Sequence, residues 1–79
     1  MQSNRNKLID PDLLKLAARI KLFRCSIGWS QTQLANNMGR DKQTIQRLEK
    51  GKVNPGFLLL RDIARGLNVR LGILMDIGN

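Results

Sequence analysis

Hydrophobic residues recur at intervals of three and four through most of the chain after residue 10, which is the spacing of helices that bury one face. The first such stretch predicts a helix from about Pro11 to Ser26, because Asp10 can cap its start and Pro11 suits the first helical position. Gly28 ends this helix. Trp29, in the segment that follows, is expected to pack against the hydrophobic core. The inward-facing positions of the helix are Leu13, Leu16, Ala17, Ile20, Phe23 and Ile27.

Residues 31 to 50 contain two shorter helical patterns, separated by the single glycine Gly39. Their apolar faces consist of Leu34, Ala35 and Met38 in the first pattern and of Ile45 and Leu48 in the second. Gly39 can take the left-handed backbone angles that a tight turn favours. Ser30 followed by Gln33 is a capping-box pattern, and Asp41 can cap the second helix. This spacing predicts a helix-turn-helix.

The second of these helices carries a polar stripe on the side away from its apolar residues. The stripe consists of Lys42, Gln43, Gln46, Arg47 and Lys50. Lysine and arginine can donate to guanine O6 and N7, and glutamine can pair with adenine N6 and N7. A single such residue is more often part of a solvated helix face, but the whole stripe after a glycine turn favours DNA. We expect Lys42, Gln43, Gln46 and Arg47 to read base edges.

Two further helices are predicted in the last third of the chain. Asn54 can cap the first of them and Pro55 can start it. Its expected core contacts are Phe57, Leu58, Leu60, Ile63, Ala64 and Leu67. Gly66 should weaken this helix by about 1 kcal/mol, and Asn68 can end it in the left-handed conformation. The last helix is expected over about residues 70–76, with inward positions at Leu71, Leu74 and Ile77.

Three segments make residues 13 to 77 resemble the Xre-type regulators, the phage repressor and Cro-like helix-turn-helix family. They read IKLFRCSIGWSQTQLA, TIQRLEKGKVNP and LLLRDIARGLNVRLGILM. The resemblance implies an all-α, five-helix repressor-like DNA-binding domain. We expect this domain over residues 11–79, after a flexible N-terminal arm over residues 1–10. It also implies a sequence-specific transcriptional regulator that occupies a palindromic or pseudopalindromic operator.

The resemblance also implies particular contacts to the DNA backbone. Gln31 matches the family position that holds a phosphate at a helix start. In the family, the loop after the second helix of the helix-turn-helix binds the DNA backbone with main-chain amides. With the nearby cations and hydroxyl, the expected phosphate contacts are Gln31, Arg40, Thr44, Lys50, Lys52, Asn54, Gly56 and Phe57. Arg24 and Glu49 match a paired arginine and glutamate of the family, which implies a partly buried ion pair.

Composition narrows the function independently. The chain has 79 residues, 14 Lys and Arg against 6 Asp and Glu, and a net charge of +8, so one small domain attracts polyanions. Its apolar faces look complementary to one another, which favours a core over membrane binding. With no histidine and one cysteine, Cys25, expected to be a packed small residue, we expect no metal site, no cofactor and no enzymatic activity. No secretory signal is visible, so a cytoplasmic location is expected.

The partners expected are double-stranded DNA and a second copy of the chain. Ile73, Met75 and Ile77 cannot all face a core that Leu71 and Leu74 already fill, so a homodimer through the C-terminal helix is expected. Within the same fold, an antitoxin with a toxin partner and a restriction-modification controller remain alternatives. A nonspecific nucleic-acid-binding accessory and a protein-interaction module are alternatives of another class.

Overall fold

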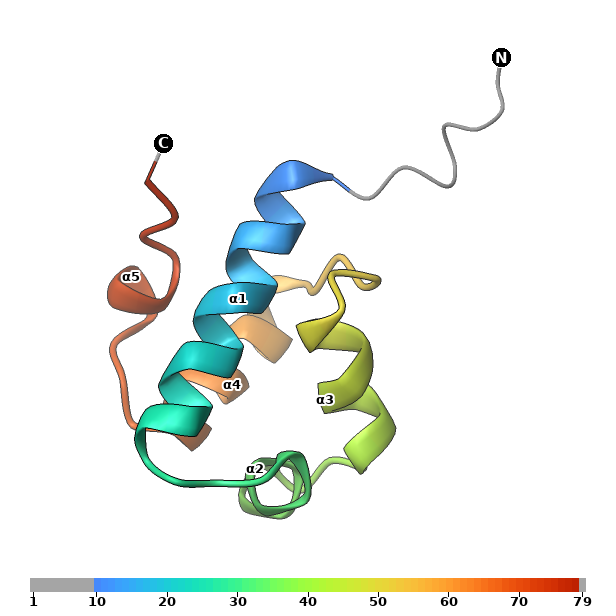
Figure 1. Ribbon diagram of the computed structural model, residues 1–79. Coiled ribbons are helices and arrows are strands. Elements are labelled where there is room, and N and C mark those ends of the chain that lie inside the picture. Colours follow the sequence, from blue (N-terminus) through green and yellow to red (C-terminus); the bar gives the residue numbers. More distant parts are fainter. Residues whose placement is uncertain (1–9, 79) are drawn as a thin grey trace.

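The computed structural model describes residues 10–78, and in this range the chain forms helices joined by turns and loops, with no strand. The described residues form five helices: α1 (Pro11–Ser26), α2 (Gln31–Met38), α3 (Lys42–Glu49), α4 (Phe57–Leu67) and α5 (Leu71–Leu74). Figure 1 shows α1 and α4 crossing at the centre, with α2 and α3 on one side and α5 on the other. The five-helix fold is therefore confirmed. The N-terminal arm expected over residues 1–10 falls, except for Asp10, outside the described residues.

The predicted caps hold the first three helices at their predicted starts. Asp10 accepts a hydrogen bond from the Asp12 amide at 2.8 Å. Ser30 and Gln33 form both bonds of the capping box. Gly39 ends α2 with φ 69°, in the left-handed region that a residue without a β-carbon enters most easily. The helix-turn-helix of α2 and α3 therefore follows from local signals.

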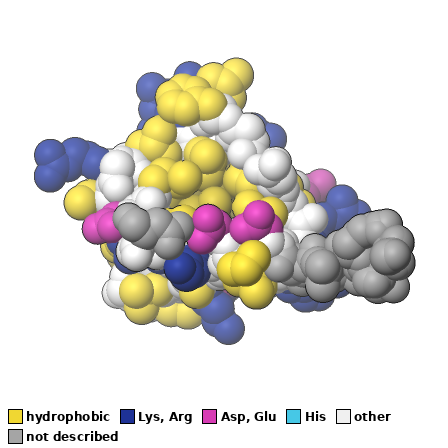
Figure 2. Space-filling model, turned by 90° about the horizontal axis from the view of Figure 1, so that it is seen from above, with side chains coloured by type: hydrophobic (Ala, Val, Ile, Leu, Met, Phe, Trp, Pro, Cys, Tyr) yellow, Lys and Arg dark blue, Asp and Glu magenta, His cyan; other side chains and the backbone are white. Residues whose placement is uncertain are grey.

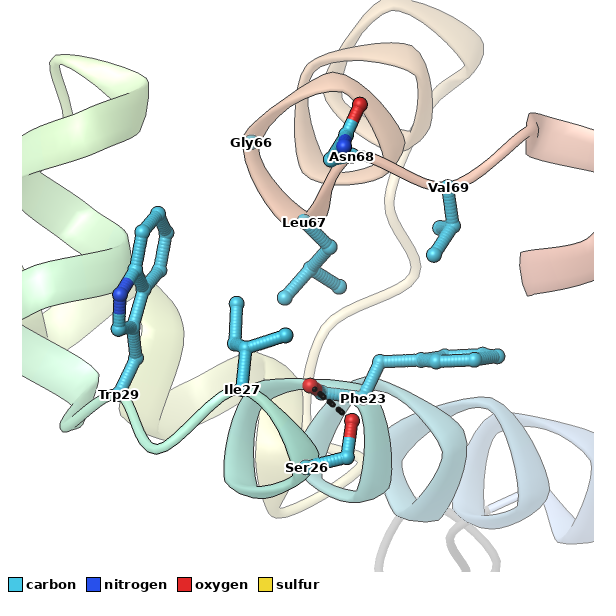
Figure 3. Close-up of a pocket in the computed structure, with 8 residues that line it drawn as sticks. All are labelled: Phe23, Ser26, Ile27, Trp29, Gly66, Leu67, Asn68 and Val69. Atoms are coloured by element: carbon cyan, nitrogen blue, oxygen red, sulfur yellow. Dashed lines mark hydrogen bonds between the residues drawn. The ribbon is translucent and has the colours of Figure 1, made fainter.

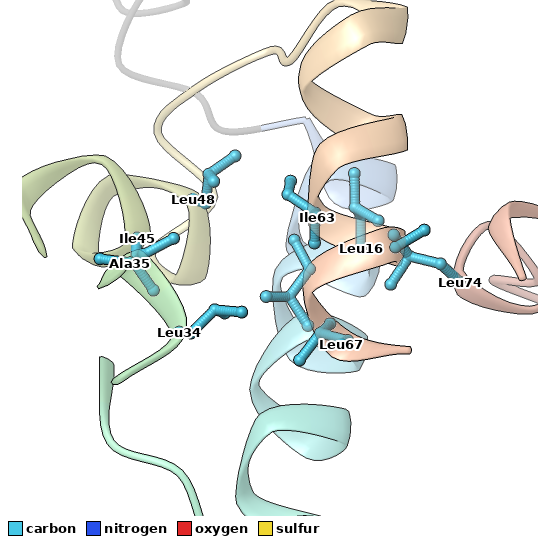
Figure 4. Close-up of a cluster of buried hydrophobic side chains, with 10 residues drawn as sticks. Leu16, Leu34, Ala35, Ile45, Leu48, Ile63, Leu67 and Leu74 are labelled. Atoms are coloured by element: carbon cyan, nitrogen blue, oxygen red, sulfur yellow. The ribbon is translucent and has the colours of Figure 1, made fainter. Parts of the chain in front are cut away.

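The hydrophobic core lies where all five helices meet (Figure 4). Its buried side chains are Leu16, Ile20, Leu34, Ala35, Ile45, Leu48, Ile63, Ala64, Leu67 and Leu74. Trp29 packs against this core from the corner between α1 and α2, as predicted. Figure 3 shows its indole ring standing at one edge of an apolar pocket of about 380 Å³, with Phe23 at the other edge.

Two expectations for the end of α1 are wrong. Ile27 is exposed, because α1 ends at Ser26 and Gly28, with φ 75°, turns the chain away from the inward-facing stripe. Cys25 is exposed as well. The buried stripe of α1 continues instead through Ile20 to Arg24, so the residue after Arg24 points away from the core.

The start of α4 also differs from the prediction. The helix begins at Phe57 with Gly56 at its N-cap and without a side-chain cap, so Asn54 does not cap it. Pro55 is not the first helical residue but is buried ahead of the helix. The first two residues of α4 lie outside the core, where Phe57 and Leu58 are 64% and 60% exposed instead of buried, and the contact with the core begins at Leu59 and Leu60. Figure 2 shows hydrophobic side chains open to solvent on the end of the molecule where α1 begins.

The last helix is shorter than predicted. It covers Leu71–Leu74 alone, with Leu74 buried and Leu71 and Ile77 partly buried against the core. Arg19 of α1 donates from Nε to the Leu74 carbonyl at 3.1 Å and from Nη2 to the Ile73 carbonyl at 2.6 Å. These bonds occupy carbonyl groups at the end of α5 and fasten it to α1.

Candidate nucleic-acid interface

The polar stripe of α3 faces solvent. Ile45 and Leu48 are buried on the opposite side of the helix, which anchors α3 against the core. Lys42, Gln43 and Arg47 are exposed and Gln46 is partly exposed. The four residues expected to read bases therefore share the accessible face of a helix whose back is fixed.

Five of the expected contact residues line one recess at the end of α3. They are Gln43, Gln46, Arg47, Lys50 and Lys52, and the recess has a volume of about 300 Å³. The loop that follows α3 folds back on this helix, because the Lys52 amide donates to the Arg47 carbonyl at 3.1 Å and Gly51 lies in the left-handed region. Three cations and two amides thus converge on one concave surface. Such a surface suits phosphate oxygens and the acceptor atoms of base edges.

The start of α3 is fixed by Asp41. Its carboxylate accepts hydrogen bonds from the Thr44 amide at 2.9 Å and from the Thr44 hydroxyl at 2.8 Å. The backbone bond and then the hydroxyl bond lower the pKa of Asp41. Thr44 is therefore engaged within the chain, and a phosphate contact through its hydroxyl would require this bond to be exchanged.

Arg24 and Glu49 form the expected ion pair. Arg24 Nε lies 2.6 Å from Glu49 Oε2, and Arg24 Nη2 lies 2.8 Å from Oε1, so the pair is bidentate. The side chains are only 10% and 4% exposed. The bonds to Glu49 raise the pKa of Arg24 against the effect of burial. Arg24 Nη1 also donates to the Trp29 carbonyl at 2.7 Å, so one guanidinium fastens α1 to α3 and to the α1–α2 corner.

Gln31, the first residue of α2, is joined to this ion pair. Its Nε2 donates to Glu49 Oε1 at 3.1 Å. The sequence suggested Gln31 as a phosphate contact but gave no sign of this bond, because it links residues 18 positions apart on different helices. The start of α2 is thereby tied to the end of α3.

Arg40 lies outside the recess and contacts α4 instead. Its Nη2 is 3.1 Å from Asp62 Oδ2, and Arg61 Nη2 is 3.2 Å from the other oxygen of the same carboxylate. The hydrogen bond from Arg40 is the largest cause that lowers the pKa of Asp62. Sequence reasoning missed Asp62, since nothing in its own helical pattern marks it as a partner of the turn.

The remaining loop residues do not line the recess. Asn54, Gly56 and Phe57 are exposed at the start of α4, beyond Lys52. Within residues 10–78, no group of three or more His, Cys, Asp or Glu side chains could hold a metal ion. No helix in that range has the length and apolar character to cross a bilayer.

Comparison with known proteins assigns the family. A model of the helix-turn-helix family (HTH_3) matches residues 20–74, from the second half of α1 to the end of α5. The chain belongs to the helix-turn-helix family of transcriptional regulators. An uncharacterized HTH-type transcriptional regulator from Archaeoglobus fulgidus is 43% identical over 56 residues, which cover 71% of this chain and 80% of that protein.

Solved structures share the fold. The restriction-modification controller C.AhdI from Aeromonas hydrophila matches with a TM-score of 0.79 and 28% identity, covering 82% of this chain and 98% of its own. The controller C.Esp1396I, solved as a tetramer in complex with its natural 35 base-pair operator, matches with a TM-score of 0.79 and 26% identity. That match covers 86% of this chain and 90% of the controller chain. The repressor-like assignment made from the sequence is confirmed.

Proposed function

We propose that this protein is a sequence-specific DNA-binding regulator of transcription that places α3 in the major groove and catalyses no reaction. The recess at the end of α3 carries the proposal, because it gathers Gln43, Gln46, Arg47, Lys50 and Lys52 on one accessible surface. The net charge of +8 supplies the long-range attraction to DNA. We place its action in the cytoplasm, where an operator would be accessible.

The residues divide into two roles. Arg47 and Lys42 would donate to guanine O6 and N7, and Gln43 and Gln46 would pair with adenine. Lys50 and Lys52 would neutralise phosphates beside the recess, and the start of α2 at Gln31 would hold another. The remaining proposed phosphate contacts are Arg40, Thr44, Asn54, Gly56 and Phe57. Of these, Thr44 would first have to exchange its hydroxyl bond to Asp41, whereas Arg40 would use guanidinium N–H groups that its bond to Asp62 leaves free.

A homodimer would give two copies of α3 and hence a palindromic or pseudopalindromic site. Ile73 and Met75 support this arrangement, because they are 45% and 39% exposed beside the point where Arg19 fastens α5. The related controller bound as a tetramer to one operator is a second support. The C-terminal region would form the contact between copies.

A restriction-modification controller is the second candidate function. The matches to C.AhdI and C.Esp1396I favour it, because each covers more than four-fifths of this chain. An antitoxin with a toxin partner has no comparable support. The genes beside this one would decide between a controller and another regulator.

Selection of bound sites from random duplexes tests the proposal. We expect an enriched motif with two similar half-sites whose centres lie about 10 base pairs apart or a multiple of that spacing. Binding without enrichment would favour a nonspecific accessory protein. Sedimentation of the free protein and of the operator complex tests the dimer. A monomer in the first measurement and one chain per operator in the second would reject it.

A further inference from the structure

Glu49 lies where three helices meet. It is the last residue of α3, and its side chain is 4% exposed. Arg24 of α1 donates to both carboxylate oxygens. Gln31, at the start of α2, adds a third bond by donating from Nε2 to Oε1 at 3.1 Å. The bidentate pair uses two of the roughly four acceptor sites of this buried carboxylate, and the bond from Gln31 uses a third.

The third bond fixes the orientation of the Gln31 amide. A carboxylate can only accept hydrogen bonds, so it holds the NH₂ group of the amide and excludes the flipped orientation that would present the amide oxygen to it. An amide nitrogen has two N–H groups, and Glu49 uses one of them. The second remains at the N-terminus of α2, where the helix dipole and the first amides favour an anion. A flipped amide would present a hydrogen-bond acceptor to a phosphate and weaken the contact.

We infer that Glu49 is a positioning residue for a DNA backbone phosphate and acts through the side-chain amide of Gln31. The ion pair with Arg24 holds the carboxylate in place, and the carboxylate holds the amide with an N–H group toward the DNA. The inference rests on the proposed binding of DNA. In addition, the buried pair would determine how well the start of α2 holds the DNA backbone without contacting the DNA itself.

A double-mutant cycle on operator affinity tests the inference. Gln31→Met keeps the length of the side chain and removes both N–H donors. Glu49→Asp keeps the negative charge opposite Arg24 but shortens the side chain by one methylene, which should remove the bond to Gln31, the longest of the three at 3.1 Å. We expect each substitution to weaken operator binding about tenfold, the size of one hydrogen bond to a charged group. The double variant should also lose about tenfold rather than a hundredfold, because both changes remove the same contact.

Lys52→Ala is the matched control, since Lys52 is a proposed phosphate contact outside the Glu49 network. In the double variant with Lys52→Ala and Glu49→Asp, the two losses of operator affinity should multiply to about a hundredfold. A hundredfold loss in the Gln31 and Glu49 double variant would overturn the inference, because Glu49 would then act without Gln31. Unchanged affinity in Gln31→Met would overturn it too. If Lys52→Ala and Arg47→Ala also left binding unchanged, the proposed function itself would fail.

The wild-type protein gives a second test that does not depend on the folding of Glu49→Asp. In nitrogen-15 NMR spectra, the side-chain amide protons of Gln31 should exchange with water more slowly than those of the exposed Gln43, and they should shift when operator is added. Exchange as fast as that of Gln43, or no shift in a complex whose other amides do shift, would overturn the inference.

Discussion

Gly66 of α4 lies so close to Met38 of α2 that a β-carbon at residue 66 would come within 2.7 Å of Met38 Cγ. It would also lie 3.3 Å from Leu34 Cδ1. Asn37 Nδ2 donates to the Gly66 carbonyl at 2.9 Å, so the two helices are hydrogen-bonded at the same point. The sequence marks Gly66 as a weak point of its helix. In the structure it is the position that lets α2 approach α4.

Gly66→Ala should therefore destabilise the protein. Helix propensity would gain about 1 kcal/mol, but overpacking against Met38 costs about 1–3 kcal/mol. We expect a net loss of about 1 kcal/mol in the free energy of unfolding, measured with urea. In a Met38→Ala background the same substitution should become neutral or stabilising. Gly72→Ala is the control, because a β-carbon there meets nothing within 4 Å, and equal stabilisation by both alanines would contradict the packing argument.

Arg24→Met should be strongly destabilising. The substitution keeps much of the side-chain volume but leaves the buried carboxylate of Glu49 without its cationic partner. Loss of one member of a buried pair costs about 3–5 kcal/mol, whereas an exposed pair contributes about 0–1 kcal/mol. Arg40→Met is the matched control, since it also removes one positive charge but from a partly exposed pair. Urea unfolding curves with similar midpoints for the two variants would reject the structural role of the Arg24–Glu49 pair.

Stability should fall in acid in a way that depends on Asp62. Its pKa is lowered in the folded protein, chiefly by the hydrogen bond from Arg40 and also by Arg61. Its stabilising contribution is therefore present above the unfolded pKa of about 3.9 and is lost as the pH falls through the lower folded pKa. Asp62→Asn should flatten the decrease in unfolding free energy below about pH 4. Asp76→Asn makes an equal change of charge after α5, and an identical acid profile for both variants would contradict this assignment.

Local signals were sufficient for the helix-turn-helix. The Ser30 capping box, the Asp41 cap and the left-handed Gly39 each act within a few residues, and all three lie where the sequence predicted them. The start of α4 was not predictable in this way. Asn54 and Pro55 are a reasonable helix start by themselves, but in the structure Pro55 is buried ahead of the helix, which begins at Phe57, and burial against the rest of the fold is not visible in the local sequence.

In the candidate site, too, the features that depend on local sequence were predictable and the contacts between helices were not. The polar stripe of α3 was predictable, because helical periodicity alone separates Arg47 from Ile45. The bonds of Arg40 to Asp62 and of Gln31 to Glu49 were not, since they join residues 22 and 18 positions apart. Contacts between helices depend on how the helices cross, and a single sequence does not show that. These bonds also involve Arg40 and Gln31, two of the residues proposed to contact phosphates.

Base-contacting residues should change specificity when they are replaced. Arg47→Ala and Gln43→Ala should each cost about 1–3 kcal/mol on the operator and relax the preference at particular positions. Selection of bound sites with each variant measures both effects. Equal losses on operator and scrambled duplex would show that α3 holds DNA without reading it.

Lys52→Ala should instead weaken binding to every sequence alike. The lysine lies in the recess beside Arg47 and Lys50, so removing it deletes a cation but no hydrogen bond to a base edge. The slope of log affinity against log salt concentration should become shallower by about one unit per chain, while the preferred motif stays the same. Titrations of operator and scrambled duplex at several salt concentrations measure this directly. A changed motif with an unchanged slope would move Lys52 into the base-reading set, and the recess would then lie over base edges rather than beside the backbone.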